Sequence, residues 1–203
     1  MEIASLGFSS FKIKGKSAVV VTDPFDPEKT GLKFPRTEAD IVTVSSEDHK
    51  LPSMVSGFPM VIDGPGEYEV KGVEMIVIRV DAKNLIFHFK IDNLILVHLG
   101  KLAQKLGDRE KELLNGADIL MIPVGGGDFL SAESASQVIS QIEPSVIIPM
   151  SYKTGNLNQA MAEKLSGVEL FLKQMGKAEI EPQPKFNITR DKLPAEQTIV
   201  VLE

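Results

Sequence analysis

The two halves of this 203-residue chain have different hydrophobic patterns. The first half consists of short apolar or β-branched runs separated by Gly, Pro, Asp or Asn, which is typical of a hairpin-rich sheet. These runs cover residues 3–6, 10–13, 18–22, 41–45, 60–62, 73–80, 85–90 and 94–99. Two segments, FKIK (11–14) and FHFK (87–90), alternate strictly, so each should present one buried face and one wet face.

The second half alternates helical stretches with wholly apolar runs. Helices are predicted over about 108–115, 131–142 and 156–166, starting at the good N-cap residues Asp108, Ser131 and Asn156. The apolar runs 119–122 and 146–150 lie between them and predict buried central strands. The pattern alone indicates a single domain over residues 1–203, of α/β or α+β class.

Composition limits the partners and metal ligands that this chain can use. A net charge of -6 disfavours nucleic acid and anionic membranes, which both need a basic face. Because there is no cysteine, a metal would rest on carboxylates and three histidines, His49, His88 and His98. The first residues are acidic and strand-like, unlike a signal peptide, and no apolar run is long enough to span a membrane. We therefore expect a cytoplasmic protein that does not associate with membranes.

Six short motifs follow one another along the chain: GFSSF (7–11), TVSSEDH (43–49), GPGEY (64–68), HLGK (98–101), IPVGG (122–126) and IPMSY (148–152). Their order and spacing resemble the metallo-β-lactamase superfamily, in particular its small UlaG-like branch of zinc-dependent hydrolases. The corresponding motifs of that branch read GHSSF, T/S-H-x-H-x-D-H, GPGEYEV, HLGD, IPVGG and IPMHY. The resemblance covers nearly the whole chain. It implies a four-layer αββα sandwich with any site at the loop ends between the two sheets.

The scaffold motifs match the family, whereas the metal-binding positions do not. In the family, histidines of the second, HLGD and IPMHY motifs bind two zinc ions, and the HLGD aspartate bridges them. Here Phe8 stands at the GHSSF histidine, Lys101 at the bridging aspartate and Ser151 at the IPMHY histidine. A cation at the bridging position would repel metal ions.

The loop at 45–51 contains one histidine where the family has three. An alignment with a short gap places Asp48 and His49 on the family's Asp-His pair, and this is the alignment we prefer. An ungapped alignment instead places Ser46 and Asp48 on histidine positions.

Lys101 allows two interpretations. If Glu47 and Asp48 pack into the former metal pocket, the lysine ammonium would be their countercharge. The alternative is that Lys101 starts a solvated helix and points outward. His88 belongs to the alternating strand, and we expect it to be structural.

We therefore expect a degenerate site in a non-catalytic protein that binds a small ligand or a protein partner, with no bound metal or cofactor. A further hypothesis is a plain scaffold subunit, including a homo-oligomer assembled through a sheet edge or a helix face. The expected remnant pocket comprises Phe8, Ser46, Glu47, Asp48, His49, His98, Lys101 and Ser151. The alternative is a zinc-dependent hydrolase with a single metal bound by Asp48, His49 and His98. By family analogy alone, its substrate would contain a phosphodiester, lactone or amide bond.

Overall fold

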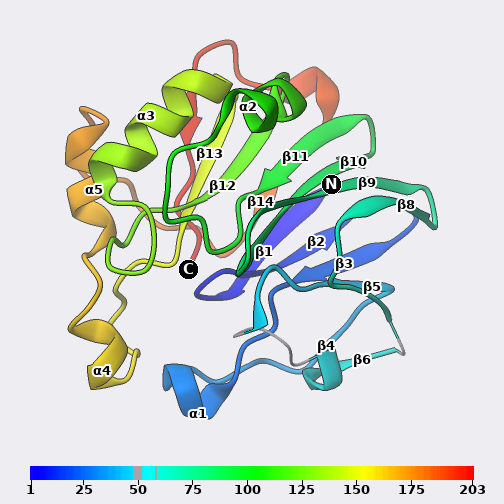
Figure 1. The fold of residues 1–203 in the computed structure, drawn as a ribbon, viewed down its shortest axis with the longest axis horizontal. Helices are drawn as coiled ribbons and strands as arrows, with labels where there is room; N and C mark the ends of the chain where they lie inside the picture. The colour runs from blue at the N-terminus through cyan, green and yellow to red at the C-terminus, as the bar shows by residue number, and fades with distance from the viewer. Residues whose placement is uncertain (48–51, 58) are drawn as a thin grey trace.

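The computed structural model describes residues 1–47, 52–57 and 59–203, which form two β-sheets packed face to face (Figure 1). The main core lies between the sheets and combines side chains of both, among them Phe11 and Ile13 from one sheet and Phe87 and Phe89 from the other. A second core lies between the larger sheet and the helices outside it. The predicted sandwich of mixed α and β structure is confirmed.

The smaller sheet has the strand order β14-β1-β2-β3-β5-β7. Its strands are β14 (Phe186–Asn187), β1 (Glu2–Gly7), β2 (Ser10–Lys14), β3 (Val19–Thr22), β5 (Ile41–Thr43) and β7 (Met60–Ile62). The first four strands are antiparallel, and β3, β5 and β7 are parallel. A two-stranded ladder of β4 (Thr37–Glu38) and β6 (Val55–Ser56) packs near its outer side through Val55.

The larger sheet has the order β15-β13-β12-β11-β10-β9-β8. Its strands are β15 (Thr198–Ile199), β13 (Val146–Met150), β12 (Ile119–Pro123), β11 (Leu94–His98), β10 (Asn84–Ile91), β9 (Val73–Asp81) and β8 (Gly66–Val70). Strands β8 to β11 form antiparallel hairpins, and β11, β12, β13 and β15 are parallel. The β10–β11 turn residues Asp92 and Asn93 both have positive φ, the backbone that a tight two-residue hairpin loop requires and that Asp and Asn tolerate.

Three helices, α2 (Asp108–Leu114), α3 (Ala132–Ile142) and α5 (Val168–Gln174), lie on the outer face of the larger sheet (Figure 1). The part of the chain that the structure describes also contains two single-turn helices, α1 (Pro27–Thr30) and α4 (Gln159–Ala162), and the 3-10 turns η2 (Pro52–Met54) and η3 (Arg190–Lys192). Ser131 caps α3 as predicted, since its hydroxyl accepts the Ser134 N–H. The helix predicted over 156–166 is shorter. It starts after Asn158, whose side chain accepts the Met161 N–H.

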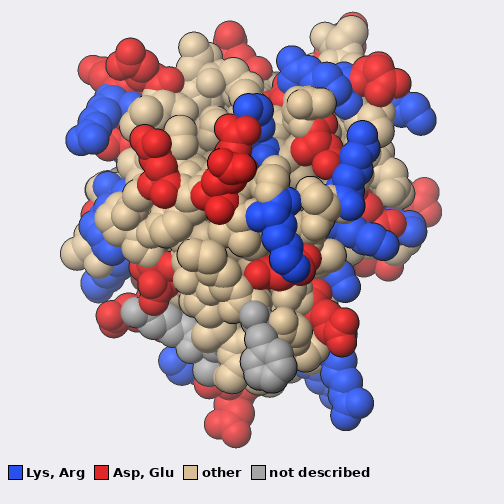
Figure 2. Space-filling view, turned by 90° about the vertical axis from the view of Figure 1, so that its right-hand side faces the viewer, with Lys and Arg blue, Asp and Glu red and all other residues tan. Residues whose placement is uncertain are grey.

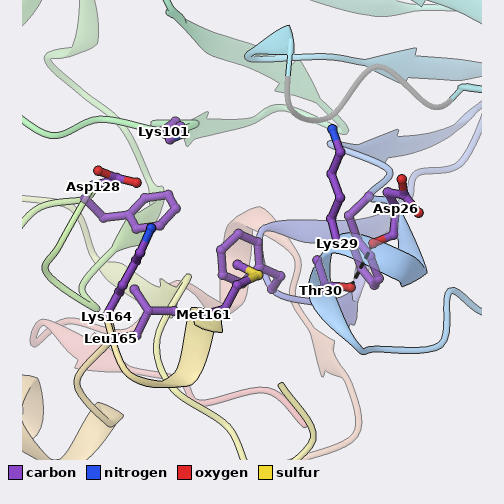
Figure 3. A pocket seen from close by; sticks show the side chains of 11 residues that line it. Asp26, Lys29, Thr30, Lys101, Asp128, Met161, Lys164 and Leu165 are labelled. Carbon is purple, nitrogen blue, oxygen red and sulfur yellow. Dashed lines mark hydrogen bonds between the residues drawn. The ribbon is translucent and has the colours of Figure 1, made fainter. Parts of the chain in front are cut away.

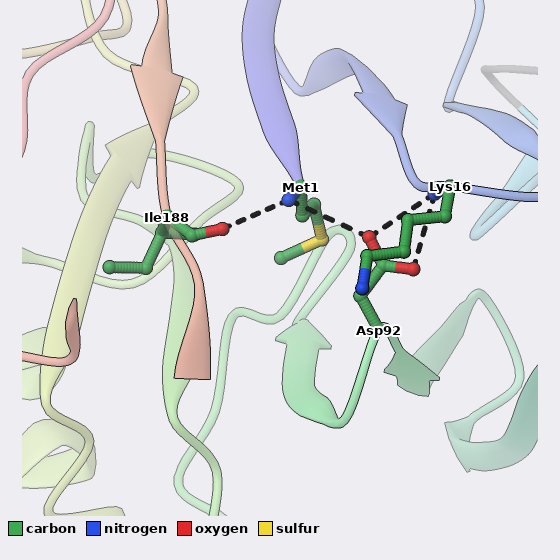
Figure 4. A network of polar contacts seen from close by, with 4 residues as sticks. All are labelled: Met1, Lys16, Asp92 and Ile188. Carbon is green, nitrogen blue, oxygen red and sulfur yellow. Dashed lines mark hydrogen bonds and ion pairs between the residues drawn. The ribbon is translucent and has the colours of Figure 1, made fainter. Parts of the chain in front are cut away.

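A polar network joins the amino terminus to both sheets at one end of the molecule (Figure 4). The Met1 amine donates to the Ile188 carbonyl at 2.9 Å and lies 3.6 Å from an Asp92 carboxylate oxygen. The same carboxylate accepts the Lys16 N–H at 3.1 and 3.2 Å. Asp92 therefore ties the β10–β11 turn to the smaller sheet.

On the face shown in Figure 2, acidic and basic side chains are interspersed rather than separated. This face therefore presents no extended field of one sign. Within the described ranges, we find no helix with the length and apolar character needed to cross a membrane.

Candidate functional site

The predicted site positions that the structure describes meet at one end of the sandwich. His98 Nε2 lies 2.9 Å from the Ser9 carbonyl oxygen, which joins the end of β11 to the β1–β2 turn. The Ser151 N–H donates to the Phe8 carbonyl at 3.1 Å, which joins the end of β13 to the same turn. Leu85 donates its N–H to the Ser45 carbonyl at 2.8 Å, so the loop after β5 is attached as well. The two sheets thus bring these motifs together, although they are far apart in sequence.

His98 is completely buried, and both of its ring nitrogens are hydrogen-bonded to backbone groups. Nδ1 lies 3.2 Å from the Gly100 N–H and accepts its hydrogen bond. Because a carbonyl can only accept, Nε2 must carry the proton and donate to Ser9. The ring also packs edge-on against Phe11, with 6.1 Å between centroids. In this arrangement His98 is a neutral structural bridge between the sheets.

Lys101 follows a turn that only glycine can make. Gly100 has φ +59, and a Cβ there would lie 2.5 Å from Asn84 Oδ1 and 2.6 Å from the Leu85 carbonyl oxygen. The Lys101 N–H donates to Asn84 Oδ1 at 2.6 Å. Its side chain is partly exposed, and Nζ lies 6.0 Å from the centroid of the Phe129 ring. The proposed helix start at Lys101 is wrong, because the nearest helix, α2, begins only at Asp108.

The predicted ion pair between Lys101 and the Glu47–Asp48 carboxylates stays a prediction. Glu47 is exposed at the end of the described part of this loop. Asp48 and His49 lie outside the described residues.

Phe8 occupies the left-handed backbone region with φ 58, which is uncommon for a bulky residue. Its ring packs edge-on against Phe129, with 5.5 Å between centroids. Phe8 lines two cavities, one of about 240 Å³ beside Lys101 and one of about 650 Å³ beside Ser151. The aromatic ring therefore stands between them at the position where the family has a histidine.

Several buried hydroxyls surround this end of the sandwich. The Ser151 side chain is 1% exposed, and its hydroxyl has no hydrogen-bond partner within the described part of the chain. The hydroxyls of Ser9, Ser46 and Thr43 share this property. Buried polar atoms without protein partners are commonly satisfied by ordered water. Ser151, and Ser46 in the ungapped alignment, thus offer neutral oxygens at positions where the family has histidines.

Asp23 has a structural role that the sequence pattern does not reveal. This carboxylate is fully buried, and Asp23 has φ 43. Its two oxygens accept the Ser45 N–H at 2.7 Å and the Ser45 hydroxyl at 2.6 Å. Asp23 therefore fixes the start of the loop that contains Ser46 and Glu47. In the sequence, an Asp-Pro pair after a strand is typical of a turn, and the pattern does not show that the Asp23 side chain accepts hydrogen bonds from a residue 22 positions away.

Two other side chains, His88 and Tyr152, have pKa values that burial shifts from their ordinary range. His88 is half-buried on β10, and burial lowers its pKa. It is not among the residues that line either of the cavities at Phe8. Burial, and then the Glu169 carboxylate, raise the pKa of the Tyr152 hydroxyl next to Ser151. Tyr152 thus remains a neutral group near the site at ordinary pH.

The described side chains do not fit the zinc centre that the resemblance implies. No group of three His, Asp or Glu residues suited to a metal ion occurs within residues 1–47, 52–57 and 59–203. The one described histidine of the expected set, His98, has both nitrogens engaged. Lys101 contributes a cation and Ser151 a neutral hydroxyl, and neither is a typical zinc ligand.

Comparisons with known proteins agree with the fold. The Beta-lactamase superfamily domain matches residues 2–151. The crystal structure of a protein from Thermotoga maritima, named as a candidate zinc-dependent hydrolase of the metallo-beta-lactamase superfamily, is 32% identical with a TM-score of 0.85. The match covers 99% of this chain and 97% of that chain. This chain therefore belongs to the metallo-β-lactamase superfamily.

More distant structures show the same fold. A metallo hydrolase from Ignicoccus hospitalis is 14% identical with a TM-score of 0.63, and the match covers 93% of this chain and 99% of that chain. A metal-dependent hydrolase candidate from Veillonella parvula is 11% identical with a TM-score of 0.62, and the same shares are covered. At these identities the likeness concerns the fold alone.

Proposed function

We propose that this chain keeps the metallo-β-lactamase scaffold without the dinuclear zinc centre, and that it binds a small ligand without hydrolysing it. The observation that carries this proposal is the hydrogen bonding of His98, because neither ring nitrogen has a lone pair left for a metal ion. Lys101 adds a positive charge at the position of the bridging aspartate. The chain would be a diverged member of the UlaG-like branch, folded as one domain over residues 1–203.

The rival function is a hydrolase with a single metal bound by Asp48, His49 and His98. This function is supported by the side-chain types of the three residues, since histidine and carboxylate ligands suit a catalytic zinc site. It requires His98 to release either the Gly100 N–H or the Ser9 carbonyl. The released backbone group would then be buried without a hydrogen bond. We prefer the first function for this reason.

The acidic chain without cysteine also fits a cytoplasmic protein whose partner is not a nucleic acid.

Hydrolysis assays separate the two functions. Phosphodiester, lactone and β-lactam reporters are incubated with the protein and added zinc or manganese. We expect no turnover above that of the same metal in buffer, because no described side chain of the site is placed to hold a metal ion that would acidify a bound water. Turnover that is abolished both by a chelator and by His98→Gln would contradict the proposal. Glutamine offers a donor and an acceptor, as the neutral histidine ring does, so the variant can keep hydrogen bonds of the same kind. Loss of turnover would then not simply reflect unfolding.

A further inference from the structure

The smaller cavity beside Lys101 has aromatic and apolar walls. Its volume is about 240 Å³, and its lining includes Phe8, Phe25, Phe129, Met161 and Leu165. Phe8 and Phe129 meet edge-to-face, and both line the cavity, so a flat ligand inside it would contact aromatic side chains. Phe129 and Leu165 belong to a small apolar cluster of their own, apart from the main cores. This cluster forms the wall of a site between the β1–β2 turn, the loop after β12 and α4.

The rim of this cavity carries more positive than negative groups, although the chain as a whole is acidic. Lys29, Lys101 and Lys164 line it together with Asp26 and Asp128. In Figure 3, Lys101, Asp128 and Lys164 lie on one side, Lys29 and Asp26 on the other, and Met161 between them. The Asp26 carboxylate accepts the Glu28 N–H at 2.9 Å and so caps the amino-terminal end of α1.

Two of the lysines can turn their ammonium groups toward a ligand. Lys29 and Lys164 are exposed, and neither forms an ion pair within the described part of the chain. They stand on different elements, Lys29 on α1 and Lys164 just after α4. An acidic group at the mouth could therefore be approached by cations from both sides, while the apolar part of the same molecule enters between the rings.

We infer that this cavity binds an organic anion made of one flat ring system and a single acidic group, a carboxylate or a phosphate. The ring packs against Phe8 and Phe129, and the acidic group lies near Lys164 and Lys29. The cavity volume of about 240 Å³ lies just below the roughly 300 Å³ at the lower end of small-molecule pockets, which suits a ligand of one or two fused rings rather than a larger one. The inference rests on the proposed function, because a zinc centre would itself attract the acidic group.

A titration followed by amide NMR tests this inference on the whole chain. The probes are 2-naphthoate, 2-naphthyl phosphate, neutral 2-naphthamide and inorganic phosphate. We expect 2-naphthoate or 2-naphthyl phosphate to shift resonances of residues 128–129 and 164–165. The amide and inorganic phosphate should each bind at least about fivefold more weakly, because each lacks one of the two contacts. Which of the two aromatic anions binds more tightly identifies the acidic group.

Variants separate the ring contact from the charge contact. Lys164→Gln should weaken the aromatic anion roughly fivefold, and Phe129→Leu should weaken it by a similar factor. The matched control is Lys173→Gln, an exposed lysine on α5 that does not line the cavity, and it should change nothing. Absence of binding by both aromatic anions, equal binding of 2-naphthamide, or unchanged binding to Lys164→Gln would each overturn the inference.

The zinc content of the same samples distinguishes this inference from the proposed function. Failure to bind the aromatic anions with no zinc present would overturn the anion site alone. Stoichiometric zinc, with anion binding that persists in Lys164→Gln, would overturn both, since the metal would then hold the acidic group.

Discussion

At the scale of single residues, two histidines with similar sequence contexts have different roles. Both follow apolar residues on neighbouring strands of the larger sheet, β10 and β11. His98 points between the sheets and is fully buried with two backbone partners. His88 is only half-buried, and burial lowers its pKa. Sequence alone identifies both as histidines on strands, but only the three-dimensional contacts show which nitrogen is a donor.

The tautomer of His98 is a direct consequence of this geometry. We expect Nε2 to carry the proton near neutral pH and Nδ1 to be unprotonated, and we expect zinc to leave both nitrogen resonances unmoved. Long-range ¹⁵N–¹H correlation spectra of the labelled protein provide the measurement. A ring nitrogen of His98 that shifts with one equivalent of zinc would show that it is a metal ligand.

His88 predicts a specific pH dependence of stability. Because its pKa is lowered from 6.5 in the folded state, the unfolded chain binds more protons below that pH. The contribution of His88 to the free energy of unfolding should therefore be fully present above about pH 6.5 and should be lost as the pH falls below that value through the lowered pKa of the folded state. Urea unfolding of the wild type and of His88→Gln measures this, and the variant should lose less stability over that interval. Equal slopes would mean that His88 does not cause the dependence.

At the scale of elements, the hydrophobic pattern predicted most strands but not all helix boundaries. The alternating segments behave as expected, since Phe87 and Phe89 are fully buried while Lys90 is exposed. Helix α5 was missed, and the predicted helix over 156–166 is reduced to the single turn α4. The Asn158 side chain sets the start of α4 because it accepts the Met161 N–H, and its own amide donates to the Lys29 carbonyl. Such a tertiary contact has no periodic signal in the sequence.

The β10–β11 turn gives a prediction about one element. Asp92 adopts φ 53, accepts the Lys16 N–H and pairs with the Met1 amine, and its side chain is 11% exposed. Asp92→Asn keeps the turn preference and an acceptor, so it should cost at most about 1 kcal/mol. Asp92→Ala loses both and should cost about 2–3 kcal/mol. Urea unfolding compares the two variants, and equal costs would contradict the assigned role of the turn.

At the scale of the whole molecule, the motif order was sufficient to predict the sandwich, and the site was predictable only in part. The structure brings Phe8, His98, Lys101 and Ser151 to one end of the two sheets. The sequence did not reveal the cavity, because Lys29 and Lys164 belong to no motif. Only the fold brings them to opposite sides of the same cavity. Asp48 and His49 lie outside the described residues, so their alignment with the family's ligands remains a prediction.

The zinc content of the purified protein tests the central claim most directly. Protein prepared without chelator is assayed by elemental analysis, and its melting temperature is recorded with and without a chelator. We predict well under one tightly bound zinc per chain and an unchanged melting temperature, because a folded state that binds no metal gains no stability from it. One zinc per chain together with a large drop in melting temperature on chelation would contradict the account and favour the single-metal hydrolase.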